Sequence, residues 1–466
     1  LAKEQVIAER VRGSFRDPSG FVFVADGTFY RQVNRSFSDE YDACVSSGLY
    51  DDLIQKRLLV AHRDVGIGFA ATPDAHAVIE PTPVPFISYP YEWSFGQLRD
   101  AALLTLDVQE RALDRGFVLR DASAYNVQLV DGGPLFIDTL SFERYHDGAP
   151  WAGYKQFCEH FLVPLALMSV RDPRCGRLQR EYLDGIPLDL GSALLPRGSW
   201  LRPSLLLHVH VHARAMRRYE SASVAEVTGG RRLGKKALLR LVASLRDAVL
   251  GLEWRPEGTA WSRYTSDHGY SEQALESKRR LVREYVSAAT PRTVWDLGGN
   301  TGTFSRIARE VAELVVCFDA DPAAVESNYR EVRARKETGL LPLQMDLMNP
   351  SPENGWAHEE RLSLESRGPA DLVMALALVH HLAIANNVPL PTLAAWLARL
   401  GRSLLIEFVP KSDSQVARLL TNRADIFPRY TPEELERAFE PGWRIEAKQR
   451  IDDSQRMLYL MRRRQG

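Results

Sequence analysis

The stretch from Thr293 to Asn328 constrains the fold more than any other part of the chain. An apolar run ends at Trp295 and is followed by a turn with three glycines, Asp296 to Gly302, and then by a segment with helical periodicity. Glycines in such a turn allow the first amides of the helix to approach a ligand closely. A second apolar run ends in Asp319, about twenty residues beyond the turn, where a carboxylate can bind ribose hydroxyls. The pattern predicts a nucleoside-binding βαβ unit.

The residues of the turn indicate which nucleoside is bound. A dinucleotide-binding turn has the pattern G-x-G-x-x-G, whereas this turn reads D-x-G-x-N-x-G, from Asp296 through Gly298 and Asn300 to Gly302. This arrangement resembles motif I of the class I S-adenosylmethionine-dependent methyltransferases. Asn300 stands where a glycine is commoner, and asparagine tolerates left-handed backbone angles better than most residues. The resemblance implies that Asp296 faces the methionine end of the cofactor and that Asp319 binds its ribose.

The rest of the C-terminal region fits the same family. Further apolar strands are expected before Asp346, at 371–379 and at 403–409, and two alternating stretches around a turn at 452–454 predict a terminal hairpin. Parallel strands followed by such a hairpin resemble the seven-stranded, Rossmann-like methyltransferase sheet, in which Asp346 is the adenine-side acid. The cofactor-binding residues implied by the resemblance are Asp296, Gly298, Asn300, Gly302, Asp319, Ala320, Asp346, Leu347 and Ala375.

Two histidines follow the fourth expected strand and are the first candidates for catalysis. Methyl transfer from a sulfonium depends mainly on alignment, and it needs a base when the acceptor must lose a proton. Histidine suits that task near neutral pH, so His380 and His381 are candidate bases, and Glu407 is a second candidate base or an orienting partner. A purely structural role at the strand end is the alternative for the histidines. In the segment before the turn, the candidates for lining the pocket are Tyr264, His268, Tyr270 and Lys278.

Length and composition set the general frame. A chain of 466 residues implies two or three domains, since single cores rarely exceed about 250–300 residues. With 59 basic and 60 acidic residues, no overall charge attracts nucleic acid or a membrane. The four cysteines form no C-x-x-C pair, and no long apolar run or signal-peptide pattern is present, which predicts free thiols and a cytoplasmic protein. The chain begins with Leu1 rather than Met, which is compatible with a removed leader.

The N-terminal region predicts an α+β domain with a second recognisable pattern. An Asp26-Gly27 turn inside an alternating stretch predicts a hairpin at 20–34, and helical and extended segments follow. The stretch 119–143, LRDASAYNVQLVDGGPLFIDTLSFE, resembles the catalytic loop and metal-binding acid of kinase-like and aminoglycoside-phosphotransferase-like folds. In those folds the first Asp accepts the proton of the substrate hydroxyl, while the Asn and the later Asp hold magnesium on ATP. By this resemblance the kinase-like site contains Asp121, Asn126 and Asp138.

Other parts of the kinase pattern are missing. No G-x-G-x-x-G precedes the first hairpin, and Arg31 stands at the expected position of the ATP-binding lysine. The planar guanidinium is not equivalent to a lysine ammonium. Three interpretations stay open: an active phosphotransferase, a kinase-like scaffold reused for substrate or partner binding, and coincidence. We expect the scaffold to hold the methyl acceptor or its carrier without phosphoryl transfer.

A basic segment separates the two regions. Between residues 171 and 255, Lys and Arg outnumber Asp and Glu two to one, and 229–252 ends as a basic amphipathic helix. We expect a kinase-like domain at 1–205, a basic helical linker at 206–260 that either is solvated or binds an acidic partner, and a methyltransferase domain at 261–466. His208, His210 and His212 could share one face, but no acid lies nearby to complete a metal site, so no metal is expected.

The sequence therefore predicts an α/β methyltransferase sheet preceded by an α+β kinase-like domain. The paired layout resembles bacterial methyltransferases that have been grouped with nodulation proteins. The expected acceptor is an oxygen, nitrogen or acidic carbon of a small or carrier-bound molecule. The alternatives are a protein or RNA methyltransferase, and a bifunctional kinase-like enzyme and methyltransferase. DNA is not expected, because ALALVHHL occupies 375–382 where many DNA methyltransferases have an N-P-P-Y type motif.

Overall fold

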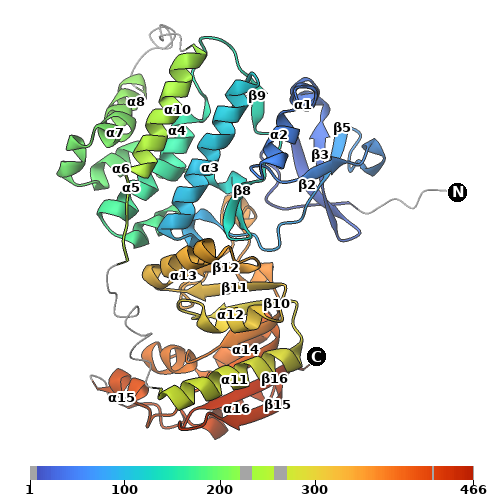
Figure 1. Cartoon of the computed structure of the whole chain (residues 1–466). Coiled ribbons are helices and arrows are strands. Elements are labelled where there is room, and N and C mark those ends of the chain that lie inside the picture. Colours follow the sequence, from blue (N-terminus) through green and yellow to red (C-terminus); the bar gives the residue numbers. More distant parts are fainter. Residues whose placement is uncertain (1–7, 221–233, 257–269, 422–424, 465–466) are drawn as a thin grey trace, which may run out of the picture. The chain divides into compact units, whose positions relative to one another are not determined.

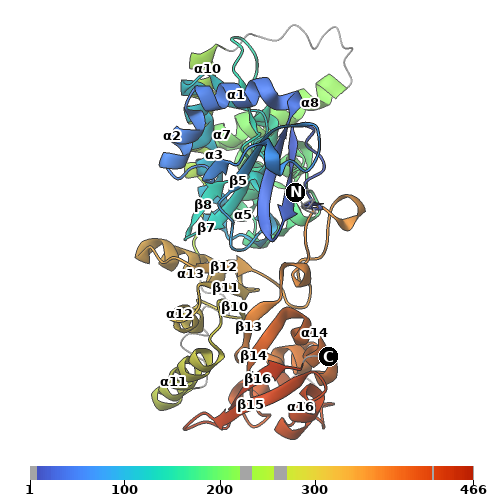
Figure 2. The same ribbon diagram turned by 90° about the vertical axis from the view of Figure 1, so that its right-hand side faces the viewer.

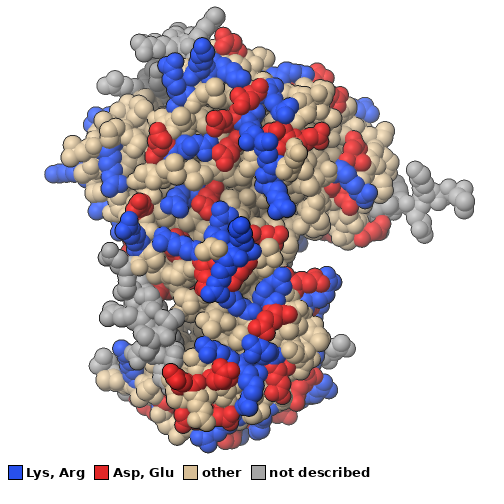
Figure 3. All heavy atoms as spheres, in the orientation of Figure 1, with Lys and Arg blue, Asp and Glu red and all other residues tan. Residues whose placement is uncertain are grey.

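The computed structural model describes residues 8–220, 234–256, 270–421 and 425–464. The chain forms two compact units (Figure 1). Unit 1 contains Leu1–Arg255 together with the short segment Glu353–Arg361, and unit 2 contains Pro256–Pro352 and Leu362–Gly466. None of the helices in the described ranges is long and apolar enough to cross a lipid bilayer. Acidic and basic side chains are interspersed over the face shown in Figure 3.

Unit 2 is built on a seven-stranded sheet with the order β12-β11-β10-β13-β14-β16-β15. The first five strands in this order are parallel, and the terminal hairpin adds β16 and β15 in antiparallel orientation. This confirms the predicted seven-stranded sheet and its closing hairpin. The strands are β10 Thr293–Leu297, β11 Leu314–Asp319, β12 Leu340–Gln344, β13 Ala370–Ala375, β14 Gly401–Phe408, β15 Trp443–Arg450 and β16 Met457–Arg463.

Helices cover both faces of this sheet (Figure 2). The helices α11, α12 and α13 lie on one side of the strands, and α14 and α16 lie on the other. Because both faces are covered, the parallel strands are largely buried, and even the edge strand β12 has all five of its residues buried. The helices of unit 2 are α11 Glu272–Ala289, α12 Thr303–Arg309, α13 Pro322–Arg335, α14 Leu390–Leu400, α15 Ser414–Leu420 and α16 Pro432–Phe439.

Unit 1 begins with a five-stranded antiparallel sheet of order β1-β2-β3-β5-β4. The predicted hairpin is present, because Asp26 and Gly27 both take positive φ values, 50° and 75°, in the two-residue turn between β2 and β3. Its strands are β1 Glu9–Arg10, β2 Gly20–Ala25, β3 Thr28–Asn34, β4 His62–Asp64 and β5 Ala75–Pro81, and two helices, α1 Ser38–Ser46 and α2 Leu49–Gln55, separate β3 from β4.

The second half of unit 1 is mainly helical and is centred on the long helix α3, Phe95–Asp114. Ser94 caps this helix by accepting a hydrogen bond from the amide of Gln97, whose side chain accepts one from Ser94 in return. Two small two-stranded antiparallel sheets, β6 with β9 and β7 with β8, carry the stretch that resembles the kinase loop. These elements and the helices that follow are β6 Phe117–Leu119, β7 Val127–Val130, β8 Gly133–Phe136, β9 Phe142–Arg144, α4 Gly153–Phe157, α5 Val163–Val170, α6 Leu188–Leu194, α7 Pro203–Leu205, α8 His212–Glu220 and α10 Lys235–Leu250.

The structure corrects the predicted linker at 206–260. Helix α10 packs on α3 and buries Leu238, Val242 and Leu245 within unit 1. Arg246 lies 2.7 Å from Asp107 and 3.0 Å from Glu110, both on α3. The apolar face of α10 is therefore buried against unit 1. On its basic face, Arg246 pairs with acids of α3 instead of facing solvent. The boundary between the compact units lies at residue 255, within the segment 206–260 that was expected to link them.

Unit 1 also includes nine residues from the connection between β12 and β13. In this segment, Glu360 lies 2.6 Å from Arg16, and the side-chain amide of Asn354 donates a 2.6 Å hydrogen bond to a main-chain oxygen. The guanidinium of Arg361 lies 3.9 Å from the centre of the Tyr125 ring. Unit 1 is therefore assembled from two separate parts of the sequence, which the sequence analysis did not predict.

Candidate active site

The turn after β10 has the backbone that a close-fitting ligand loop requires. Gly298, Asn300 and Gly302 have φ values of 74°, 51° and 81°. A Cβ atom on Gly299 would lie 2.5 Å from the sulfur of Cys317, so no larger residue fits there. The predicted glycine-rich turn is present, and the left-handed angle of Asn300 explains why asparagine can take the place of glycine.

Asp296 lies under this turn near the end of β10. Only 1% of its surface is exposed, and its Oδ2 accepts a 2.6 Å hydrogen bond from the hydroxyl of Ser305 on α12. Burial raises the pKa of Asp296 to about 6, and the hydrogen bond from Ser305 and the charge of Lys278 limit the shift. The carboxylate is therefore poised to ionise fully beside a positively charged ligand.

Asp319 ends β11, the strand next to β10 in the sheet. Its two carboxylate oxygens accept 2.8 Å hydrogen bonds from the main-chain amides of Asn300 and Asp321. Burial is also the main cause that raises the pKa of Asp319, to about 6. Asp319 is thus hydrogen-bonded directly to the glycine-rich turn. The turn and this acid, which the sequence predicts as the two parts of a nucleoside site, therefore lie next to each other.

The other predicted cofactor residues lie at the same edge of the sheet. Asp346 and Leu347 follow β12, and an Oδ atom of Asp346 accepts a 3.0 Å hydrogen bond from the amide of Met348. Ala320 follows β11, and Ala375 is the last residue of β13. Because β10 to β13 are parallel, their carboxyl ends meet at one edge, where ligands of open α/β sheets bind.

The two predicted histidines follow β13 close to the turn. A Cβ atom on Gly298 would lie 3.3 Å from Leu378, two residues before His380. His380 has no exposed surface, and neither of its ring nitrogens has a partner among the described residues. The rings of His380 and His381 lie 4.1 Å apart. Burial lowers the pKa of His381 to about 4 and that of His380 well below its usual value, so both imidazoles are neutral at neutral pH.

Glu407 on β14 is fully buried and belongs to a charged cluster at the same edge. The Lys278 ammonium lies 2.7 Å from its Oε2, Nη1 of Arg456 lies 3.5 Å from its Oε1, and the Tyr270 hydroxyl donates to Oε1. Burial alone would raise the pKa of Glu407, but Lys278 and Arg456 outweigh it and lower the pKa. A carboxylate so firmly paired is a poor proton acceptor, so this environment favours an orienting role.

Arg456 is the member of this cluster that sequence reasoning missed. It precedes β16 in the terminal hairpin, is 1% exposed and binds Asp413 through Nε at 2.7 Å and Nη2 at 3.1 Å. No pattern in the sequence distinguishes this arginine from the other basic residues of the hairpin. Of the predicted pocket residues, Tyr270 and Lys278 belong to the cluster, whereas Tyr264 and His268 lie outside the described residues.

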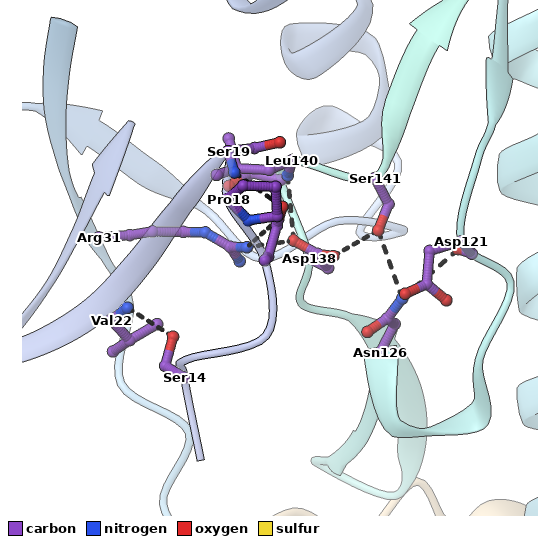
Figure 4. A network of polar contacts seen from close by, with 12 residues as sticks. Ser14, Pro18, Ser19, Val22, Arg31, Asp121, Asn126, Asp138, Leu140 and Ser141 are labelled. Carbon is purple, nitrogen blue, oxygen red and sulfur yellow. Dashed lines mark hydrogen bonds and ion pairs between the residues drawn. The ribbon is translucent and has the colours of Figure 1, made fainter. Parts of the chain in front are cut away.

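A second polar cluster lies in unit 1 and contains all four residues predicted for the kinase-like site (Figure 4). Nη2 of Arg31 on β3 lies 2.6 Å from Oδ1 of Asp138, whose other oxygen accepts a hydrogen bond from Ser141. The side-chain amide of Asn126 donates to Ser141 at 3.3 Å and to the main-chain oxygen of Asp121 at 3.4 Å. Both oxygens of Asp138 are therefore occupied by groups of the protein.

The electrostatics of this cluster follow from the arginine. Burial alone would raise the pKa of Asp138, but Arg31 and the hydrogen bond from Ser141 lower it. Burial and the negative charge of Asp138 raise the pKa of the Asp121 carboxyl. The guanidinium of Arg31 supplies the positive charge that a carboxylate of this kind otherwise takes from a metal ion or ligand.

Two of the three closely spaced histidines are hydrogen-bonded to other side chains, and the ring of His212 stacks on Tyr154 with 4.7 Å between the ring centres. His208 has Tyr154 and Ser244 at 2.9 Å, and His210 has Ser192 and Ser199 at 2.8 Å. In the parts of the chain that the structure describes, no group of three His, Cys, Asp or Glu side chains is arranged to hold a metal. The cysteines are free thiols, as predicted.

Comparison with known proteins identifies one close relative of nearly the same length. The chain is 38% identical to nodulation protein NoeA of Rhizobium meliloti (strain 1021) over 467 residues, which is 97% of this chain and 96% of that protein. No protein-family model matches. Among solved structures, N-methyltransferase NodS from Bradyrhizobium japonicum WM9 is 10% identical with a TM-score of 0.32, covering 42% of this chain and 99% of that one. Magnesium protoporphyrin IX methyltransferase ChlM from Synechocystis PCC 6803, with bound SAH, is 17% identical with a TM-score of 0.31, covering 44% and 95%.

Proposed function

The chain belongs to the family of nodulation protein NoeA, and we propose that its unit 2 is an S-adenosylmethionine-dependent methyltransferase. The hydrogen bond between Asn300 and Asp319 carries this proposal. It joins the glycine-rich turn to an acid at the carboxyl end of the neighbouring parallel strand, which is where a nucleoside lies in a sheet of this kind.

The residues of the site fit this cofactor. A Cβ atom on Gly299 or Gly302 would lie 2.5 Å from a neighbouring side chain, so these positions stay glycine and present main-chain atoms to a ligand. The carboxylate of Asp319 retains lone pairs for ribose hydroxyls, and Asp346 stands on the adenine side. The buried acid Asp296 matches the positive charge of the methionine end. When bound, the cofactor supplies an electrophilic methyl group on a sulfonium.

The chain's own task is to align the acceptor and to remove its proton where necessary. His380 and His381 follow β13 as neutral imidazoles, so a ring nitrogen of either can accept a hydrogen bond from the acceptor and take its proton while the methyl group is transferred. Glu407, fixed by Tyr270, Lys278 and Arg456, orients the surrounding side chains. This assignment suits an oxygen, nitrogen or acidic carbon acceptor on a small or carrier-bound molecule. A protein or RNA acceptor is the alternative.

For unit 1 we propose that a kinase-like α+β fold holds the acceptor or its carrier and transfers no phosphate. The four residues expected at a magnesium-ATP site are present together, but Arg31 binds the carboxylate that would hold the metal. The neighbouring arginine of this site, Arg120, which precedes Asp121, is also paired with an acid of the protein, because it lies 3.1 Å from Asp17. The alternative is a bifunctional kinase-like enzyme and methyltransferase.

Transfer of labelled methyl groups tests the proposed acceptor class. The full-length protein is incubated with labelled S-adenosylmethionine and an extract from the source cells, in parallel samples treated beforehand with nuclease or protease. We expect label in a low-molecular-weight fraction that both treatments leave intact. Label that disappears after protease or nuclease treatment would favour the protein or RNA alternative. A sample with the Asp319→Asn variant is the matched control, and it should take up less label if transfer depends on cofactor binding at this site.

A further inference from the structure

Lys278 on α11 is a buried ammonium beside the glycine-rich turn. Its side chain is 3% exposed, and its Nζ lies 4.5 Å from the ring centre of Phe304, the second residue of the helix that follows the turn. Its Nζ also lies 4.9 Å from the ring centre of Tyr270. Because the side chain is almost fully buried, each hydrogen-bond donor of the ammonium needs a partner in the protein or in a ligand.

Two of the three donors of this ammonium have partners. Nζ lies 2.7 Å from Oε2 of Glu407 and donates a 3.1 Å hydrogen bond to the Tyr270 hydroxyl. A lysine ammonium has three N–H groups, and no described residue takes the third. Glu407 also has Tyr270 and Arg456 as partners, so its negative charge is not held by Lys278 alone. Lys278 can therefore serve a second anion without leaving Glu407 unpaired.

The surroundings of Lys278 indicate which anion this is. Asp296, the buried acid under the turn, lies close enough for the charge of Lys278 to stabilise its ionised form. The two residues thus present one negative and one positive charge next to the same turn. An α-amino acid group carries an ammonium and a carboxylate two bonds apart, and a buried pair of opposite charges is the complement of such a group.

We propose that Lys278 binds the carboxylate of the methionine moiety of S-adenosylmethionine through its third N–H group. This inference rests on the proposed function of unit 2 and deepens it, because it assigns the amino-acid end of the cofactor to a residue on α11. It also gives the cluster around Glu407 a role, since Glu407 and Tyr270 hold the ammonium in place for the ligand.

The test compares two ligands that differ only in the carboxylate. The affinities of S-adenosylmethionine and of decarboxylated S-adenosylmethionine are measured by calorimetry on the full-length protein. The wild type should bind the complete cofactor about ten- to a hundredfold more tightly, as a charge-assisted hydrogen bond in a buried site implies. In Lys278→Met this preference should shrink to about twofold or less, while the affinity for the decarboxylated ligand changes little.

Two further variants keep the test decisive. Lys278→Met/Glu407→Gln removes both charges of the ion pair and leaves no unpaired charge in the core, so it should fold even if Lys278→Met does not. It should show the same loss of preference for the complete cofactor. Lys448→Met removes a half-exposed lysine of β15 in the same unit and should leave the preference intact. Equal binding of both ligands by the wild type, or an unchanged preference in both Lys278 variants, would refute this inference alone. Failure of the wild type to bind either ligand would refute the proposed function as well.

Discussion

Nη2 of Arg31 lies 2.6 Å from Oδ1 of Asp138, and the two side chains are only 14% and 15% exposed. This ion pair joins the first sheet of unit 1 to the segment that follows β8. The guanidinium therefore links two parts of unit 1 and occupies the carboxylate that a metal-nucleotide site would need.

Breaking this pair should destabilise the protein. Removing one partner of a buried ion pair leaves an uncompensated charge, so Arg31→Ala should lower the free energy of unfolding by about 3 kcal/mol. Arg31→Ala/Asp138→Asn should recover part of this loss, because the unpaired charge is gone. Urea titrations measure both values. Arg63→Ala, which removes the exposed partner of Glu80, is the control and should cost less than about 1 kcal/mol. Equal losses for Arg31→Ala and Arg63→Ala would contradict the account.

Unit 1 should not turn over ATP. Because Arg31 and Ser141 occupy both oxygens of Asp138, the full-length protein should neither hydrolyse ATP in the presence of magnesium nor form a phosphorylated product. A sensitive phosphate-release assay measures this, and Asp121→Asn should leave the affinity for S-adenosylmethionine unchanged. ATP hydrolysis that is lost in Asp138→Ala would show that the chain is a bifunctional enzyme.

The buried acid Asp296 should make stability depend on pH. Burial raises its pKa from 3.8 to about 6 in the folded protein, so between pH 4 and 6 the folded state binds more protons than the unfolded state. The contribution of Asp296 to stability therefore falls as the pH rises through this window, by about 3 kcal/mol in total at about 1.4 kcal/mol per pKa unit. Urea titrations of the cofactor-free wild type and Asp296→Asn should show the wild type losing stability relative to the variant between pH 4 and 6. A constant difference over pH 4–8 is the contrary result.

The pH dependence of methyl transfer should lack the usual histidine transition near pH 6.5. Burial lowers the pKa of His381 to about 4, and the base form predominates above the pKa, so the rate should fall only as the pH drops toward 4. His381→Ala or His380→Ala should slow transfer by about 10²- to 10⁴-fold if that residue is the base. The rates are measured with saturating cofactor and the acceptor fraction that takes up label. Full activity of His380→Ala, His381→Ala and Glu407→Ala would exclude this mechanism.

The sequence predicts those features that depend on neighbouring residues. The Asp26-Gly27 hairpin, the glycine-rich turn and the acid after β11 are each determined by local backbone preferences and by strand and helix periodicity. The position of α10 was not predicted, because its basic residue Arg246 pairs with acids on α3 that lie far away in the sequence. The inclusion of 353–361 in unit 1 and the burial of Arg456 have the same origin, since both depend on tertiary contacts that leave no periodic pattern.

Calorimetry with S-adenosylmethionine, S-adenosylhomocysteine and NAD tests the central claim, which is that unit 2 binds the methyl donor. The wild type should bind the first two and not NAD, because the turn from Asp296 to Gly302 lacks the G-x-G-x-x-G pattern of a dinucleotide-binding turn. Asp319→Asn should weaken binding of both by about ten- to a hundredfold, or 1–3 kcal/mol, since the charged acceptor for the ribose hydroxyls is lost. Binding of NAD without binding of either S-adenosyl compound would contradict the account.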